Sequence, residues 1–394
     1  MKPGISVQHT ALPTRRYGIV RCDVAGIIGF IPKDSWPTDA SAGDFMELSL
    51  RRTQELLDHP LKALFDAPSR RAVKAFFDNG GDECHLYGVC LDGLGQLIQP
   101  ETLDHALGPL LERLRGHEEI ALLAVPAAAY LPCTFTRLGA VSSHADTLYR
   151  TLLVHCRQMV NRFLILDAPR DLHGPAVVSW LQNLQESQGD ELAYGALYYP
   201  WLKAGEELMP PSGSVLGVFA RTEREHEPFG VVWPPANTPV HGITHLQVEL
   251  DTNESGELAA QGVNPIVVQP GRGVLIFGAR TLSTEKRWEY INSRRIVSMI
   301  SEQLRRDNEW VVFEQNSPAM WKVLERDVKA RLDEFWQAGM LTGASAGRDY
   351  MVRCDAETNP KEARETGQMA VEVRLRPITT TEHITIDLRL GEAV

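Results

Sequence analysis

The chain has 394 residues, of which 43% are apolar and 23% charged, with a formal net charge of −11. A chain of this length can bury a sizeable core and favours two domains. The acidic balance, without a run rich in lysine and arginine, argues against a nucleic-acid-binding protein. The first residues contain no stretch of signal-peptide length, and no apolar run approaches the roughly eighteen residues of a membrane span. We therefore expect a soluble protein that stays in the cytoplasm where it is made.

Six cysteines are scattered through the chain, and no two of them have Cys-x-x-Cys spacing. Zinc ribbons and dithiol redox sites need such close pairs. We therefore expect reduced, mostly buried thiols that behave as small apolar residues.

The first half of the chain predicts alternating strands and helices. Residues 1–24 contain Ile5 and Val7 among prolines and glycines, and we expect them to be extended. The apolar run 24–31 predicts a buried strand, and residues 44–58 and 66–78 predict helices. Further strands are expected at 85–91, 120–125, 162–167 and 192–198, and further helices at 103–115, 145–161 and 175–188. This alternation predicts an α/β fold with a mixed, mostly parallel sheet.

The second half begins less regularly. Prolines cluster between residues 200 and 262, which indicates loops and a domain boundary. Beyond them we expect strands at 274–277 and 310–313 and helices at 285–307 and 318–337. Two strands of period two, 369–375 and 383–390, lie at the end of the sequence. The alternating apolar residues are Val371, Val373 and Leu375 in the first and Ile384, Ile386, Leu388 and Leu390 in the second.

Few residues could carry chemistry. His241 and His245 resemble the histidine motif of subtilisin-like proteases, but the Gly, Ile and Thr between them oppose the helix that a zinc-binding pair needs. Ser212 is the nearest candidate nucleophile, and turn chemistry explains its Ser-Gly-Ser context better than a nucleophile elbow does. We therefore expect no catalytic residue, no cofactor and no metal site. A divergent hydrolase that uses His241 or His245 stays open as an alternative.

Three further segments are interpreted as turns. Pro270-Gly-Arg-Gly273 lacks the Lys-Ser/Thr of a phosphate-binding loop, and Asp92-Gly-Leu-Gly95 lacks the third glycine of a dinucleotide fingerprint. Asp355, Glu357 and Asn359 alternate as calcium ligands do, but their loop lacks the glycine and the final glutamate of an EF-hand. None of the three predicts a ligand.

Several segments resemble contractile tail sheath proteins, the family that forms the sheaths of contractile phage tails, R-type tailocins and phage-derived extracellular injection systems. The similarity follows the family's order over most of the chain and is densest between residues 262 and 354. The segments include Phe76-Phe-Asp-Asn-Gly-Gly81, Arg162-Phe-Leu-Ile-Leu-Asp167, Pro210-Pro-Ser-Gly-Ser-Val-Leu-Gly217, Gly278-Ala-Arg-Thr-Leu-Ser283, Trp310-Val-Val-Phe-Glu314 and Thr358-Asn-Pro360.

The resemblance implies a structural, energy-storing subunit rather than an enzyme. It implies a sheath core that is subtilisin-like in fold only, a C-terminal α/β lobe and extended strand arms at both ends. The implied domains are 1–24, 25–261, 262–376 and 377–394. The implied partners are further copies in stacked hexameric rings, an inner tube protein, baseplate and cap proteins, and sheath paralogues. Nucleic acid and membrane insertion are not implied, and assembly is expected in the cytoplasm of a bacterium, within a phage tail or a releasable tail-like particle.

The resemblance also implies how subunits join. In this family terminal arms donate strands to a sheet of a neighbouring subunit, where main-chain hydrogen bonds give affinity and alternate side chains set the register. Ile5 and Val7 would belong to the N-terminal donor strand. The C-terminal donor strand would contain Ile384, Ile386, Leu388 and Leu390, and the accepting pair Val371, Val373 and Leu375. Contraction would run from a metastable lattice to a more stable one without a nucleotide. A baseplate or cap adaptor that forms no long polymer is a further alternative.

Overall fold

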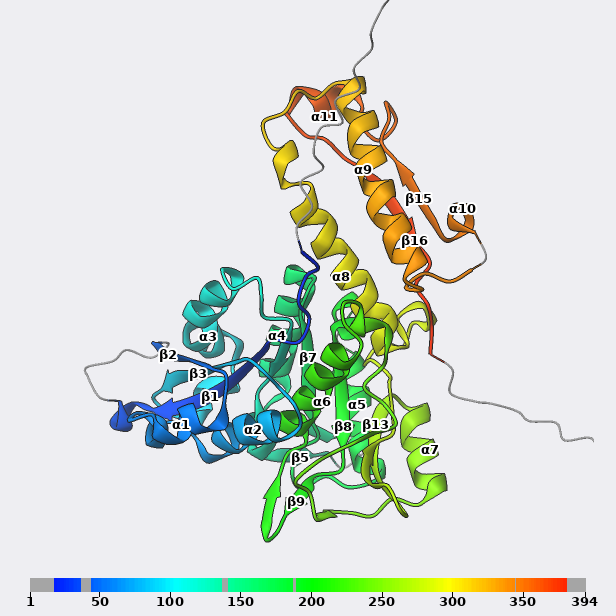
Figure 1. Cartoon of the computed structure of the whole chain (residues 1–394). Coiled ribbons are helices and arrows are strands. Elements are labelled where there is room, and N and C mark those ends of the chain that lie inside the picture. The colour runs from blue at the N-terminus through cyan, green and yellow to red at the C-terminus, as the bar shows by residue number, and fades with distance from the viewer. Residues whose placement is uncertain (1–17, 37–43, 137–140, 187–188, 344, 381–394) are drawn as a thin grey trace, which may run out of the picture. The chain divides into compact units, whose positions relative to one another are not determined.

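The computed structural model describes residues 18–36, 44–136, 141–186, 189–343 and 345–380 (Figure 1). These residues divide into two compact units. The large unit contains residues 21–299 and 377–380, and the small unit contains residues 18–20 and 300–376. The boundary falls inside one helix, at residue 300, whereas the sequence placed a domain boundary at residue 262.

The large unit is built on a nine-stranded sheet. Its strands are, in spatial order, β11 (Thr238–Pro239), β14 (Gly273–Ile276), β13 (Val263–Gln269), β8 (Gly195–Tyr199), β7 (Phe163–Asp167), β4 (Leu122–Ala124), β1 (Ala25–Pro32), β3 (Cys84–Leu91) and β2 (Phe45–Leu50). The run from β13 to β3 is parallel throughout, and β2, β14 and β11 add antiparallel edges. The predicted α/β fold with a mixed, mostly parallel sheet is therefore confirmed.

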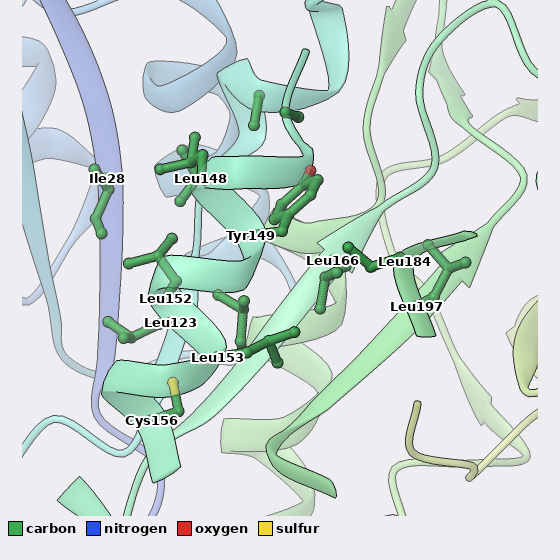
Figure 2. Packing of buried hydrophobic residues seen from close by; sticks show 14 of the residues in the cluster. Ile28, Leu123, Leu148, Tyr149, Leu152, Leu153, Cys156, Leu166, Leu184 and Leu197 are labelled. Carbon is green, nitrogen blue, oxygen red and sulfur yellow. The ribbon is translucent and has the colours of Figure 1, made fainter. Parts of the chain in front are cut away.

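Helices cover both faces of this sheet, because its strands bury both of their faces. Successive residues of β1 alternate between two apolar clusters: Ile28 belongs to one and Ile27 to the other. The first cluster packs against α3 (Pro100–Arg115), α4 (Asp146–Met159) and α5 (Pro175–Glu186), and the second against α2 (Ala67–Asp78) and α6 (Ser212–Glu225). Figure 2 shows Leu152 and Cys156 of α4 facing the strands in the first cluster.

Two glycines let α6 pack directly on the backbone of α2. A Cβ atom at Gly213 would lie 2.5 Å from the Cα of Ala72, and one at Gly217 would lie 2.3 Å from the carbonyl oxygen of Phe76. Real Cβ atoms do not approach other atoms so closely, so this contact between helices needs glycine at both positions. Gly213 belongs to the Ser-Gly-Ser segment that indicated a turn in the sequence, and Gly217 follows it on the same helix.

Shorter elements complete the large unit. They are α1 (Thr53–Asp58), α7 (Thr252–Ala260), the hairpin of β5 (Cys133–Phe135) and β6 (Val141–Ser143), and the small sheet of β9 (Leu202–Ala204), β10 (Glu207–Met209) and β12 (His245–Leu246).

The small unit contains two long helices and a two-stranded sheet. Its elements are the part of α8 (Ile291–Asp307) from Ile300 onward, α9 (Pro318–Gln337), α10 (Ala346–Asp349), β15 (Tyr350–Arg353), α11 (Lys361–Glu365) and β16 (Glu372–Leu375). A buried ion pair ties its helices together: Arg331 of α9 donates to both carboxylate oxygens of Asp307, at 2.5 and 3.1 Å. Ser317 caps α9 by accepting from the amide of Met320.

Four local predictions were wrong. Residues 44–58 form strand β2 and the short helix α1, because pairing with β3 outweighs the helical pattern. The helix expected at 285–307 begins only at Ile291. Residues 310–313 form no strand; Glu309–Val311 is a 3-10 turn. Helix α6 was missed, because prolines and a Ser-Gly-Ser segment precede its apolar turns and a proline is tolerated where a helix begins.

Candidate binding groove

The predicted accepting residues lie on a strand with one open edge. Val373 and Leu375 belong to β16, and Val371 directly precedes it. β16 pairs with β15 alone among the described residues, in an antiparallel register that places Val373 opposite Val352. Its other edge therefore offers backbone N–H and C=O groups for pairing, and such an edge is a template for a further strand.

A buried asparagine, Asn359, holds the backbone of Ala370, two residues before β16 begins. The side chain of Asn359 accepts from the amide of Ala370 at 2.7 Å and donates to the carbonyl oxygen of Ala370 at 2.9 Å. Asp355 folds the preceding turn by accepting the amides of Glu357 and Thr358 on one carboxylate oxygen. This segment is a turn, as expected from the sequence, and its role is to hold the start of β16 in place.

An apolar groove of about 670 Å³ lies beside this strand within the small unit. Val371 and Val373 contribute one wall, while Leu375 is not among the residues that line the groove. The opposite walls come from Leu304 of α8 and from Leu324 and Val328 of α9. Because side chains alternate along a strand, Val371 and Val373 point to the same face, and the groove continues that face beyond the strand.

The loop after α8 adds apolar side chains that are not buried. Val312 is 63% exposed and Phe313 is fully exposed, and both line the groove. Phe313 also has a φ angle of 73°, a conformation that a bulky residue adopts only at a cost of order 1–3 kcal/mol. Val312 and Phe313 thus leave apolar side chains uncovered beside the groove in the described structure.

The C-terminal end of α8 beside the groove carries paired charges. Glu302 accepts hydrogen bonds from Arg305 at 2.9 Å and Arg306 at 2.6 Å. Burial raises the pKa of the Glu302 carboxyl, but these two guanidinium groups outweigh burial and hold the pKa below its ordinary value. Arg305 and Arg306 are thus engaged within the chain.

The predicted donor residues lie outside the described part of the chain. These are Ile5 and Val7 near the start and Ile384, Ile386, Leu388 and Leu390 near the end. The described residues next to them are anchored. Within the small unit, Gln303 bonds to the amide of Val20 at 2.8 Å and the carbonyl of Gly18 at 3.3 Å. Within the large unit, Asn292 accepts from Thr380 at 2.8 Å and Ser293 donates to the carbonyl of Ile378 at 3.1 Å.

The residues considered for hydrolysis are not arranged for it. Ser212 and Ser214 are fully buried at the start of α6, and His241 and His245 are exposed on a loop and the short strand β12. Ser212 donates its backbone amide to Asp167 at 2.7 Å, and neither serine hydroxyl has a hydrogen-bond partner in the described structure. A substrate carbonyl could not reach either hydroxyl without opening the core.

Sequence reasoning did not identify the helical walls of the groove or Phe313. Leu304, Leu324 and Val328 follow ordinary helical spacing, so nothing separates them from core residues. Phe313 was placed in a strand because three apolar residues follow Trp310. The run has no alternation of apolar and polar residues, and this was the signal that could have argued against a half-buried strand.

No helix in the described part of the chain has both the length and the apolar character to cross a membrane.

Comparison with known families places most of this chain in two consecutive sheath domains. The family model described as the phage tail sheath protein central domain matches residues 138–282, and the phage tail sheath C-terminal domain matches residues 283–391. A tail sheath protein of Vibrio phage KVP40 is 22% identical over 218 residues, which is 55% of this chain and 31% of that protein. A putative prophage major tail sheath protein of Pseudomonas aeruginosa is 21% identical over 250 residues, 62% of each chain. The matches thus span less than two thirds of either relative.

Solved structures share the fold over nearly the whole chain. The helical sheath of the anti-feeding prophage in its contracted state gives a TM-score of 0.70 at 23% identity and covers 98% of both chains. The contracted sheath complex of an extracellular contractile injection system, PVC, gives 0.72 at 21% identity and covers 99% of this chain and 97% of that one. A chain of the anti-feeding prophage baseplate gives 0.70 at 24% identity, with 100% and 99% covered.

Proposed function

This chain belongs to the contractile tail sheath protein family, and we propose that it is a structural subunit of a contractile sheath. Copies would polymerise as stacked rings around an inner tube protein and contract to drive that tube through a target envelope. The observation that carries the proposal is the open edge of β16 beside the apolar groove in the small unit.

We propose that the C-terminal arm of a second copy fills this site. An extended segment of eight residues, 383–390, spans roughly 26 Å and places apolar side chains on one face. Its backbone would add a strand to β16, and the side chains of Ile384, Ile386, Leu388 and Leu390 would enter the groove against Val371 and Val373. Leu375 would continue the accepting face along β16. The N-terminal arm, with Ile5 and Val7, would donate in the same way, so that each subunit is tied to neighbours on both sides.

Strand exchange suits a polymer that must change shape without coming apart. Main-chain hydrogen bonds keep neighbours attached while the subunit bodies rotate and slide. Energy would be stored in a metastable extended lattice and released when the more stable contracted lattice forms, so no nucleotide is consumed. Ser212 and Ser214 are buried, which supports a subunit that moves the tube rather than one that converts a substrate.

The further partners follow from the same proposal. They are the inner tube protein, the baseplate, a terminator or cap protein and sheath paralogues, with neither nucleic acid nor membrane insertion. Assembly would take place in the cytoplasm of the producing bacterium as part of a phage tail or a releasable tail-like particle. The alternative of an adaptor that caps the tube without forming long cylinders is not favoured by the similarity to contracted sheaths.

Electron microscopy of the chain co-expressed with a tube protein tests the proposal. We expect long striated cylinders of two diameters from the unaltered chain. Val373→Glu should abolish them, because a carboxylate would enter the groove where an apolar strand packs. Met351→Glu is the matched control, since Met351 lies on the neighbouring strand, is 40% exposed and does not line the groove.

Single rings or short stacks from the unaltered chain would favour the adaptor. Normal cylinders from Val373→Glu would contradict strand docking at this edge, and a loss of cylinders in both variants would assign the effect to general surface charge. Circular dichroism of each purified variant checks that the charge has not unfolded the chain.

A further inference from the structure

Three side chains with metal-binding atoms meet within the large unit. Glu47 comes from the edge strand β2, His85 from the adjacent strand β3, and His117 from the turn that follows α3. Their side chains are 16%, 7% and 13% exposed. The cluster is thus largely shielded from water, and the exposure of Glu47 and His117 leaves an approach from solvent.

The candidate ligand atoms of these three side chains all lie within 4.8 Å of one another. Oε1 of Glu47 lies 3.1 Å from Nδ1 of His85 and 3.6 Å from Nε2 of His117. Two ligand atoms bound about 2.1 Å from a tetrahedral ion lie about 3.4 Å apart, and the two measured separations fall on either side of that value. The 3.6 Å separation between Nε2 of His117 and Oε1 of Glu47 is longer than a hydrogen bond and within the distance of an ion pair with a protonated histidine.

The surrounding groups hold these side chains in place. Nδ1 of His117 lies 3.1 Å from a carboxylate oxygen of Glu119, which leaves Nε2 directed at Glu47. A histidine that binds a metal through one nitrogen commonly gives its other N–H to a carboxylate in this way. The buried Arg162 donates to the backbone carbonyl of His117 at 2.6 Å, which fixes the turn itself.

His85 and Glu47 are supported as well. Ser49 lies 3.1 Å from Nδ1 of His85, and Nε2 of His85 is buried with no hydrogen-bond partner among the described residues. The second oxygen of Glu47 accepts from Arg113 at 3.1 Å.

We propose that Glu47, His85 and His117 bind a divalent transition-metal ion of the zinc class, with water as a fourth ligand. Two imidazole nitrogens and one carboxylate suit zinc, whereas magnesium and calcium prefer oxygen ligands throughout. The ion would clip the edge strand β2 to β3 and to the end of α3. This site is independent of the sheath function proposed above. No motif in the sequence indicated it, because its members are separated by long intervals and Glu47 was expected in a helix.

Metal binding to the full chain tests the inference. The chain, freed of metal with a chelator, is titrated with Zn²⁺ by equilibrium dialysis, and Co²⁺ is added separately as a probe whose visible absorption reports its ligands. We expect one ion per chain at micromolar Zn²⁺ and a rise in the melting temperature. His117→Ala and Glu47→Gln should each weaken binding at least roughly tenfold. His105→Ala is the matched control, an exposed histidine on α3, and should bind as the unaltered chain does.

A second substitution separates a metal site from a cluster held only by hydrogen bonds. Arg113→Gln removes the positive charge that lies beside Glu47 and leaves all three proposed ligands in place. Because that charge repels a cation, its loss should tighten Zn²⁺ binding. The inference is overturned if the unaltered chain binds no more ion than His117→Ala does. It is also overturned if Arg113→Gln lowers the melting temperature equally with and without Zn²⁺ and leaves ion binding unchanged.

Discussion

At the scale of single residues, Asp167 is a carboxylic acid buried in the core. It ends strand β7, is fully buried, and its Oδ2 has no hydrogen-bond partner among the described residues. Burial raises the pKa of this carboxyl to about 7, although the hydrogen bond from the Ser212 backbone amide acts in the opposite direction. The unfolded chain would ionise near pH 4, so the folded chain binds more protons between pH 4 and pH 7. This group therefore makes folding less favourable as pH rises through that window.

Asp167→Asn should remove that dependence. The amide keeps an oxygen to accept the Ser212 backbone N–H and carries no charge to desolvate. We expect the variant to be more stable than the unaltered chain at pH 8, by a few kcal/mol at most, and by a smaller margin at pH 5. Denaturant unfolding of both proteins at the two pH values measures this. An identical pH dependence in the two proteins would show that Asp167 does not titrate in this range.

At the scale of elements, the contact between α2 and α6 depends on the absence of side chains. A methyl group at Gly217 would meet the Phe76 carbonyl oxygen at 2.3 Å, so Gly217→Ala must separate the two helices. We expect a loss of about 1–3 kcal/mol in the free energy of unfolding. Gly256→Ala on the exposed helix α7, where a methyl group meets nothing within 4 Å, should instead gain roughly 0.5–1 kcal/mol. Equal effects of the two changes would refute the close-packing explanation.

Element prediction succeeded where local pattern and tertiary context agree. The helix at 318–337 was placed correctly, because Pro318 at its start and the glycine after it are local signals. The buried parallel strands were found from their apolar runs. The pattern failed at β2, whose pairing with β3 overrides it, and at α6, whose glycines serve a helix contact that only the fold reveals.

Some residues of the candidate groove could be predicted from the sequence and others could not. Val371 and Val373 were found because alternation along a strand marks one face. The helical residues opposite them could not be found, since a groove forms only when two helices and a strand meet. The cluster of Glu47, His85 and His117 has no local signal at all, because strand pairing alone brings Glu47 near His85.

At the scale of the whole molecule, donation and acceptance are separate properties of one chain. Each subunit in the proposed polymer gives its C-terminal arm to one neighbour and receives an arm beside its own β16. The double variant Ile384→Asp/Ile386→Asp should accept but not donate, because charged side chains cannot enter the apolar groove. Val373→Glu should donate but not accept. Neither variant should form cylinders alone.

Mixing these two variants gives the sharpest test of the arrangement. Both variants here also carry Ile5→Asp/Val7→Asp, which removes donation by the N-terminal arm. Each Val373→Glu subunit can then give one C-terminal arm to one Ile384→Asp/Ile386→Asp subunit, and the chain of donation stops there. We therefore expect pairs of one copy of each variant by analytical ultracentrifugation, and no cylinders by electron microscopy. Two variants that merely misfold would not form such pairs, whereas long polymers in the mixture would mean that subunits join through surfaces other than the strand edge. Pairs that disappear when Val371→Glu is added to the accepting variant would locate the junction in the groove, because Val371 lines it beside Val373.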